Sequence, residues 1–108
     1  MDKNTLEKMA TTAFKNLDEA RTSLFDAAES AITTRNALDE AKYNALTGGV
    51  IDGKNAEIRE AQMKSHLQAD FLKLEQAEKS ERRKRFMFEL AQIEVDTVKT
   101  LLRIAELA

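Results

Sequence analysis

The sequence contains no cysteine and no proline, and its only glycines are Gly48, Gly49 and Gly53. Without cysteine, disulfides and cysteine-ligated zinc sites are excluded. Proline and glycine interrupt regular structure more strongly than any other residues. The three glycines all fall in one short stretch near the middle of the chain. The flanking stretches are rich in Ala, Leu, Glu, Lys, Gln and Arg, which favour helix. The composition therefore predicts two long helices joined by one turn.

The chain also lacks an excess of charge of one sign and a long apolar run. With 17 Lys and Arg against 19 Asp and Glu, its formal net charge is −2, whereas a general nucleic-acid binder is usually strongly basic. No apolar run approaches the roughly 20 residues that cross a bilayer, and the polar start of the chain differs from a secretory signal. We expect a single cytoplasmic domain over residues 1–108, with no membrane association and no cofactor.

The first half of the chain carries apolar and small residues alternately three and four positions apart. This spacing is a heptad pattern that predicts a coiled-coil helix over about residues 4–47, which Asn4 and Glu7 begin as a capping box and Thr47-Gly48 ends through a C-cap glycine. The row, called the α-seam below, consists of Leu6, Ala10, Ala13, Leu17, Ala20, Leu24, Ala27, Ala31, Thr34, Leu38, Ala41 and Ala45. Its many alanines predict a close approach of the neighbouring helix.

The second half predicts another helix, over about residues 55–107, after a turn at 48–54. Asn55 is a good N-cap, and a heptad frame continues through Met63, Leu67, Leu74, Ala77, Phe88, Ala91, Val95, Val98, Leu102 and Ala105. The fold class expected is all-α, with two long helices in an antiparallel coiled-coil hairpin that assembles into a homo-oligomeric helical bundle. The alternative is a bend of the second helix near residues 79–85, which would close a three-helix monomer.

Oligomer formation is expected because the apolar residues of the C-terminal third cover more than one helix face. A fold about Val50 would in addition leave Asp96–Ala108 beyond the start of the first helix, and this apolar overhang would need a cover. Phe14, Phe25 and Ile32 lie off the α-seam as well. The expected oligomer interface is formed by Phe86, Phe88, Ile93, Val98, Leu101, Leu102 and Ile104.

Two motifs invite a chemical interpretation. Gly48 to Asn55 has the spacing of a phosphate-binding loop, but Asn55 replaces the magnesium-binding hydroxyl and a helix precedes the loop where a strand is required. We interpret this stretch as a turn, with anion binding beside Lys54 as a weaker alternative. His66 is the only histidine and has Asp70 as its sole acidic neighbour one turn away, so no metal site is expected. No pair of carboxylates lies in an apolar setting, and an enzyme is not expected.

Lys79, Arg82, Arg83 and Arg85 belong to the only dense basic cluster. They could contact nucleic-acid phosphates. Ion pairs with Asp18 and Glu19, or within the same helix, are the favoured interpretation.

The stretch from Ile51 to Ala61 resembles a segment of small helical-hairpin proteins encoded by bacteriophages and prophages. In those proteins the turn reads G-[K/S]-N-A-E-x-R-x-A, which Gly53 to Ala61 matches. The resemblance implies an accessory protein of a phage early region, but it assigns no activity and carries over no functional residue. From the α-seam and the apolar C-terminal third we expect a non-enzymatic protein that self-associates and binds a protein partner, inhibition of a host enzyme being one form. The small secreted Trp-x-Gly hairpins are a second candidate, but this chain has no tryptophan. The alternative function is a nucleic-acid-binding factor of replication or recombination.

Overall fold

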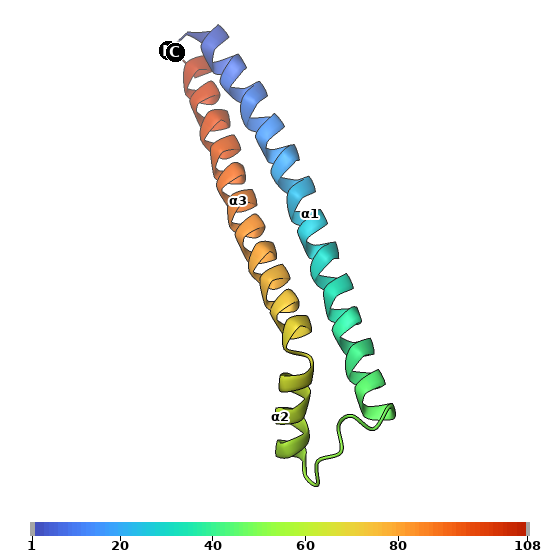
Figure 1. Cartoon of the computed structure of the whole chain (residues 1–108). Helices are drawn as coiled ribbons and strands as arrows, with labels where there is room; N and C mark the ends of the chain where they lie inside the picture. The colour runs from blue at the N-terminus through green and yellow to red at the C-terminus, as the bar shows by residue number, and fades with distance from the viewer. Residues whose placement is uncertain (1, 108) are drawn as a thin grey trace. The chain divides into compact units, whose positions relative to one another are not determined.

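The computed structural model describes residues 2–107 and contains three helices and no strand in that range. The helices are α1 (Lys3–Thr47), α2 (Ala56–His66) and α3 (Gln68–Leu107), and α1 packs against α3 (Figure 1). The all-α prediction is therefore confirmed. The chain divides into two compact units, which are described separately below. The terminal unit consists of residues 2–26 and 82–107, and the turn unit of residues 27–81.

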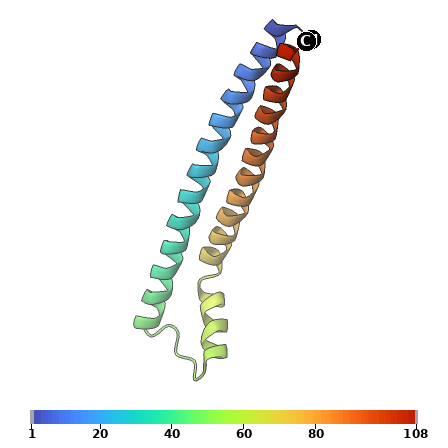
Figure 2. The same cartoon turned by 180° about the vertical axis from the view of Figure 1, so that it is seen from behind.

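The terminal unit is an antiparallel pair of helix segments around a small core. Ala13, Val95 and Val98 are buried together, and Lys3 lines one hollow with Leu102, Ala105 and Glu106. The start of α1 and the end of α3 accordingly lie side by side (Figures 1 and 2). The predicted apolar overhang at Asp96–Ala108 is therefore wrong for the described residues of that segment.

The overhang was predicted from a fold about a single point, Val50. That fold would place Phe88 opposite Ala13, but Ala13 packs against Val95 and Val98, which lie roughly two to three helical turns further on. In the turn unit, Leu46 shares a hollow with both Ala56 and Met63. The reversal therefore takes up the loop and the first turns of α2, and this extra length removes the overhang.

The α-seam is the inner face of α1, as the heptad pattern predicts. All twelve of its residues are buried or half-buried, and Ala13 and Ala31 are the most enclosed at 1% exposure each. A methyl group leaves the facing backbone close to α1, so these positions have no room for a larger or a charged side chain.

The ends of α1 differ by a residue or two from the prediction. The carboxylate of Asp2 accepts a hydrogen bond from the Thr5 backbone N–H at 2.7 Å, so Asp2, and not Asn4, is the N-cap. That hydrogen bond lowers the pKa of Asp2 below its ordinary value. At the other end Gly49 adopts the left-handed conformation, with φ 74°, whereas the prediction gave this role to Gly48.

The C-terminus of α1 is a Schellman motif. The N–H of Val50 donates to the carbonyl of Ala45 at 3.1 Å, and the N–H of Gly49 donates to that of Leu46 at 3.3 Å. These two bonds satisfy helix-end carbonyls, and they require the positive φ that glycine adopts without strain.

Side chains of α2 hold the loop that precedes it. Asn55 caps the helix by accepting from the Ile58 N–H at 2.9 Å, as predicted. Gln62 accepts from the Gly53 N–H at 2.9 Å and donates to the Asp52 carboxylate at 3.1 Å. Arg59 donates to the Gly53 carbonyl at 3.1 Å. The loop backbone is thus held by side chains of α2, the helix that follows it.

Gly53 is expected to resist substitution because α2 lies against its Cα. A Cβ at this position would stand 2.5 Å from Cγ2 of Ile58 and 3.0 Å from Oε1 of Gln62. We expect Gly53→Ala to lower the free energy of unfolding by about 1–3 kcal/mol, the usual cost of overpacking, as measured by urea denaturation. Ile58→Ala removes the closest atom and should restore part of the loss in the double variant. Equal losses with and without Ile58→Ala would contradict this account of the contact.

The second helix of the prediction is interrupted at Leu67, so the single helix over 55–107 is wrong. Leu67 has φ −107° and ψ 27°, outside the helical range. Its N–H still donates to Met63 at 2.9 Å, and its carbonyl accepts from Phe71 at 3.0 Å. The side chain is buried at 7% exposure. The distortion keeps hydrogen bonds on both sides of Leu67, and its large apolar side chain is buried.

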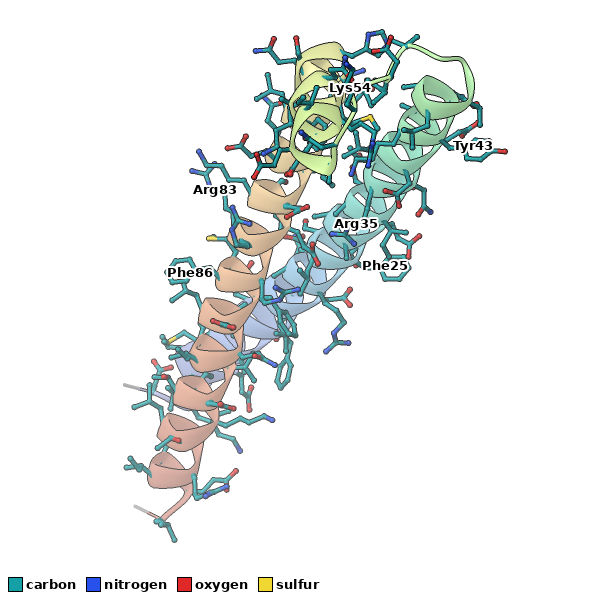
Figure 3. The ribbon with its side chains drawn as sticks, turned by 90° about the horizontal axis from the view of Figure 1, so that it is seen from below. Phe25, Arg35, Tyr43, Lys54, Arg83 and Phe86 are labelled. Carbon is teal, nitrogen blue, oxygen red and sulfur yellow. The ribbon has the colours of Figure 1, made fainter. Side chains whose placement is uncertain are left out.

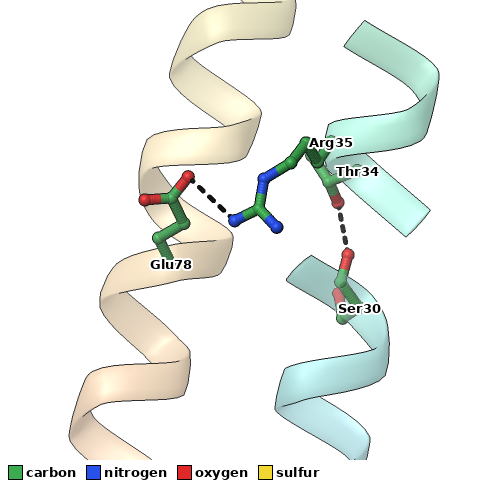
Figure 4. Close-up of polar contacts among 4 residues, drawn as sticks. All are labelled: Ser30, Thr34, Arg35 and Glu78. Atoms are coloured by element: carbon green, nitrogen blue, oxygen red, sulfur yellow. Dashed lines mark hydrogen bonds and ion pairs between the residues drawn. The ribbon is translucent and has the colours of Figure 1, made fainter. Parts of the chain in front are cut away.

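The predicted alternative of a bend near residues 79–85 is also wrong, because α3 is continuous there. In the turn unit Glu78 instead binds α1. Its carboxylate lies 3.5 Å from the guanidinium of Arg35, which follows Thr34, whose hydroxyl donates to the Ser30 carbonyl (Figure 4). Lys42 places its ammonium 5.0 Å from the ring centre of Phe71, a cation–π contact. These pairs fix α1 and α3 antiparallel in the turn unit.

Candidate interaction surface

A row of apolar and threonine side chains runs along the outside of α3 in the terminal unit. Its large members are strongly exposed: Phe86 at 59%, Ile93 at 60%, Ile104 at 59% and Leu107 at 84%. The outer α3 row, as it is called below, consists of Phe86, Leu90, Ile93, Thr97, Thr100, Ile104 and Leu107. Seven residues at three- and four-residue spacing form a second heptad frame on the same helix.

The outer α3 row is distinct from the row that packs on α1. The inner row contains Ala91, Val95 and Val98, which are all buried, and Leu102 packs against them. At 100° per residue the two rows lie roughly 140° apart around the helix. Figure 3 shows Phe86 and Arg83 pointing away from α1. The outer row therefore has no cover among the described residues of its own chain.

The structure separates the predicted interface residues into three groups. Val98 is 4% exposed in the core, and the half-buried Leu102 packs on that core, so neither belongs to the exposed row. Phe88 and Leu101 are half-buried. Phe86, Ile93 and Ile104 are exposed, and their place in an oligomer interface stays a prediction. Leu90, Thr97, Thr100 and Leu107 share the exposed row with them, and the second heptad frame would have identified these four residues.

The two threonines in the middle of the row are exposed, and their hydroxyls bond within α3. Thr97 donates its hydroxyl to the Ile93 carbonyl at 2.8 Å, and Thr100 donates to the Asp96 carbonyl at 2.9 Å. Because both hydroxyls are satisfied within α3, covering these residues leaves no unpaired donor. A hollow at this point is lined by Ile93, Asp96, Thr97, Thr100 and Leu101. The centre of the outer α3 row is therefore slightly hollowed, and a second surface could cover its threonines without leaving a hydroxyl unpaired.

The apolar residues on the outside of α1 are more scattered. Phe14 is 49% exposed, and the ammonium of Lys99 covers its ring at 5.6 Å. Phe25 and Ile32 are 64% and 49% exposed, but they belong to different units. Charged residues separate them along the helix, as at Asp18 and Arg21. No continuous row comparable to that of α3 follows from these positions.

The predicted basic residues are exposed, four of them on α3 and one in the loop. Lys79 belongs to the turn unit, whereas Arg82, Arg83 and Arg85 belong to the terminal unit and are all exposed. Lys54 lies in the loop (Figure 3). Glu19, one of the acidic residues expected to pair with the cluster, instead lies 4.0 Å from Lys15 on its own helix. The pairing predicted with Asp18 and Glu19 stays a prediction.

The loop does not have the local context of a phosphate-binding loop. It follows helix α1, and the Gly53 N–H, which such a loop would offer to phosphate, already donates to Gln62. The side chain of Asn55 is engaged as the α2 cap. His66 is exposed at the end of α2, and no group of three or more acidic or histidine residues that could hold a metal occurs among residues 2–107.

Comparison of the chain with protein-family models, with curated proteins and with solved structures found no match. Within residues 2–107, none of the helices combines the length and the apolar character needed to cross a membrane.

Proposed function

We propose that this protein is a non-enzymatic, self-associating helical hairpin that acts by binding another protein, as an accessory protein of the phage or prophage type. The observation that carries the proposal is the outer α3 row, where Ile93 and Ile104 are each about as exposed as Phe86. Contiguous apolar surface of this kind marks interaction sites in proteins. A coiled-coil arrangement suits it, because the row repeats in heptads along one helix. The resemblance of Gly53 to Ala61 supports the phage setting.

Solution mass over a range of concentrations tests the self-association. Light scattering or sedimentation should give a species of at least twice the chain mass of 12.2 kDa, with a helical circular dichroism spectrum. A species that stays at the chain mass at every concentration would remove self-association from the proposal.

Partner binding needs a separate experiment with a matched control. The tagged protein and its Phe25→Asp variant would be used to isolate stoichiometric partners from the producing cell, because Phe25 lies outside the outer α3 row. A partner retained by Phe25→Asp and lost with Phe86→Asp supports binding through α3. Recovery of no protein in stoichiometric amount would count against the protein-partner function.

Nucleic-acid binding is the second candidate, favoured by one specific observation. Arg82 and Arg83 are both exposed, and Arg83 points away from α1 (Figure 3), so phosphates could reach it. At low salt, phosphate contacts should dominate any retention of DNA or RNA. Neutralising Arg82, Arg83 and Lys79 as Gln should abolish that retention, whereas neutralising Lys8, Lys15 and Arg21 should not. Unchanged retention would exclude this function for the basic segment.

A further inference from the structure

We propose that the outer α3 row from Leu90 to Leu107 is covered by the same residues of a second copy, running antiparallel about a two-fold axis near Thr97 and Thr100. This inference rests on the self-association proposed above and specifies its geometry. Its occupant is a second copy because the row is complementary to itself in size and in charge, as the next paragraphs derive. A two-fold pairing of identical surfaces also forms a closed dimer without further growth.

The first argument is the match of side chains across the antiparallel pair. With the axis between Thr97 and Thr100, Leu90 meets Leu107 of the second copy, and Ile93 meets Ile104 of the second copy. Each of these contacts occurs twice by symmetry. Leu107, the most exposed large apolar residue at 84%, is thereby covered. The four threonines lie at the axis, where their small methyl groups allow the two helices to approach closely.

The second argument is charge. The residue before the first apolar position of each heptad lies beside the contact between the two helices. In an antiparallel pair it faces the residue at the same heptad position of the second copy. On α3 these positions are Glu89, Asp96 and Arg103. In the proposed alignment, Asp96 of each copy lies beside Arg103 of the other, which forms two symmetric ion pairs. All three residues are exposed, and none of the three has an ion pair within the described part of its own chain.

Other alignments place like charges together. A parallel, in-register pair brings Glu89 beside Glu94 of the second copy, twice. An antiparallel pair shifted by one heptad joins Glu89 to Arg103 of the second copy, but it sets Asp96 against Asp96 and Glu94 against Glu94 near the axis. Like charges facing each other across a helix pair oppose association. The charge pattern therefore selects the alignment with Asp96 and Arg103 together.

Reversal of the two charges tests this alignment. Asp96→Arg and Arg103→Glu should each weaken dimerisation roughly tenfold or more, since each replaces two attractive contacts by two repulsive ones. The double variant Asp96→Arg with Arg103→Glu should bring the dissociation constant back to near that of the unmodified protein. The two positions lie about 10 Å apart on one helix, beyond the reach of i,i+4 pairing, so recovery must come from contact between copies. Sedimentation over a concentration series measures the constant, with circular dichroism to check the helices.

Two controls make each outcome decisive. Recovery in Glu89→Arg with Arg103→Glu, in place of the Asp96 double variant, would overturn the proposed alignment. Ile93→Asp should weaken dimerisation about 30-fold or more, as for a central apolar contact, whereas Ile32→Asp on α1 should not. A dimer that none of the α3 variants alters overturns the α3 pairing but leaves self-association in place. A protein that is monomeric at every concentration overturns both.

Discussion

Ala31→Asp is expected to destabilise the protein by about 3–5 kcal/mol, the range for a buried charge without a partner. Ala31 is only 1% exposed, and no buried polar or charged residue occurs among the described residues to receive the carboxylate. A cost of this size is a large fraction of the total stability of a small domain. Chemical denaturation followed by circular dichroism would measure it.

Ala37→Asp is the matched control for this substitution. Ala37 lies on the same helix and is exposed, so the change carries the same loss of helix propensity, roughly 0.7 kcal/mol at most, without burial of the charge. The difference in unfolding free energy between the two variants therefore measures the cost of burying the carboxylate on the inner face of α1. Equal effects at the two positions would mean that Ala31 is not enclosed.

Leu38→Ala is expected to lower the free energy of unfolding by about 2–5 kcal/mol. Leu38 is 2% exposed and is among the few large side chains of the α-seam. Its neighbours in the seam are mostly alanines, which bury little area each, so a single leucine contributes a large share of the apolar burial. The cavity left behind adds to the loss, because alanines cannot extend to fill it.

Leu72→Ala provides the comparison, since Leu72 belongs to the same turn unit and is 52% exposed. We expect a change below about 1 kcal/mol there. Thermal unfolding of both variants beside the unmodified protein would reveal the contrast. Similar shifts for Leu38→Ala and Leu72→Ala would contradict the assignment of Leu38 to the core.

The inner face of α1 could be predicted from the sequence almost completely. The spacing of its small and apolar residues is regular from Leu6 to Ala45, and only a helix places such a row on one side. The cap at Asn55 was predictable for a similar reason, because its hydrogen bond depends on residues only three positions away. Both features depend only on residues a few positions apart, and a sequence pattern predicts geometry at that range.

The features that sequence reasoning missed depend on contacts between distant residues. Leu67 interrupts the second helix without a glycine or proline nearby, and its side chain is buried. The alignment of α1 with α3 depends on how much chain the reversal takes up, and the side chains of Gln62 and Arg59 bond to the loop at Gly53. An error of two to three turns in that alignment placed Val98 and Leu102 on the surface.

The candidate surface was predictable in outline. The excess of apolar residues in the C-terminal third indicated that α3 has more apolar faces than α1 can cover, and Phe86, Ile93 and Ile104 confirm the exposure. The sequence analysis did not separate the inner row of α3 from the outer α3 row, because the two heptad frames alternate along the same helix. The outer row was overlooked because Thr97 and Thr100 are polar and so break the run of apolar residues at its spacing. Their hydroxyls bond within the helix, so both residues can still belong to an apolar row.

The antiparallel arrangement within each unit also determines an order of events when the chain folds. Lys42 and Phe71, in contact in the turn unit, are separated by a far shorter stretch of chain than Ala13 and Val95 in the terminal unit. Closing a loop costs more entropy as the loop lengthens, by roughly 0.6 kcal/mol for each doubling. The turn unit is thus expected to form before the terminal unit. Newly made chains would accordingly pass through a stage in which the inner residues of the terminal unit, Ala13 and Val95 among them, are still uncovered and open to contact with another chain.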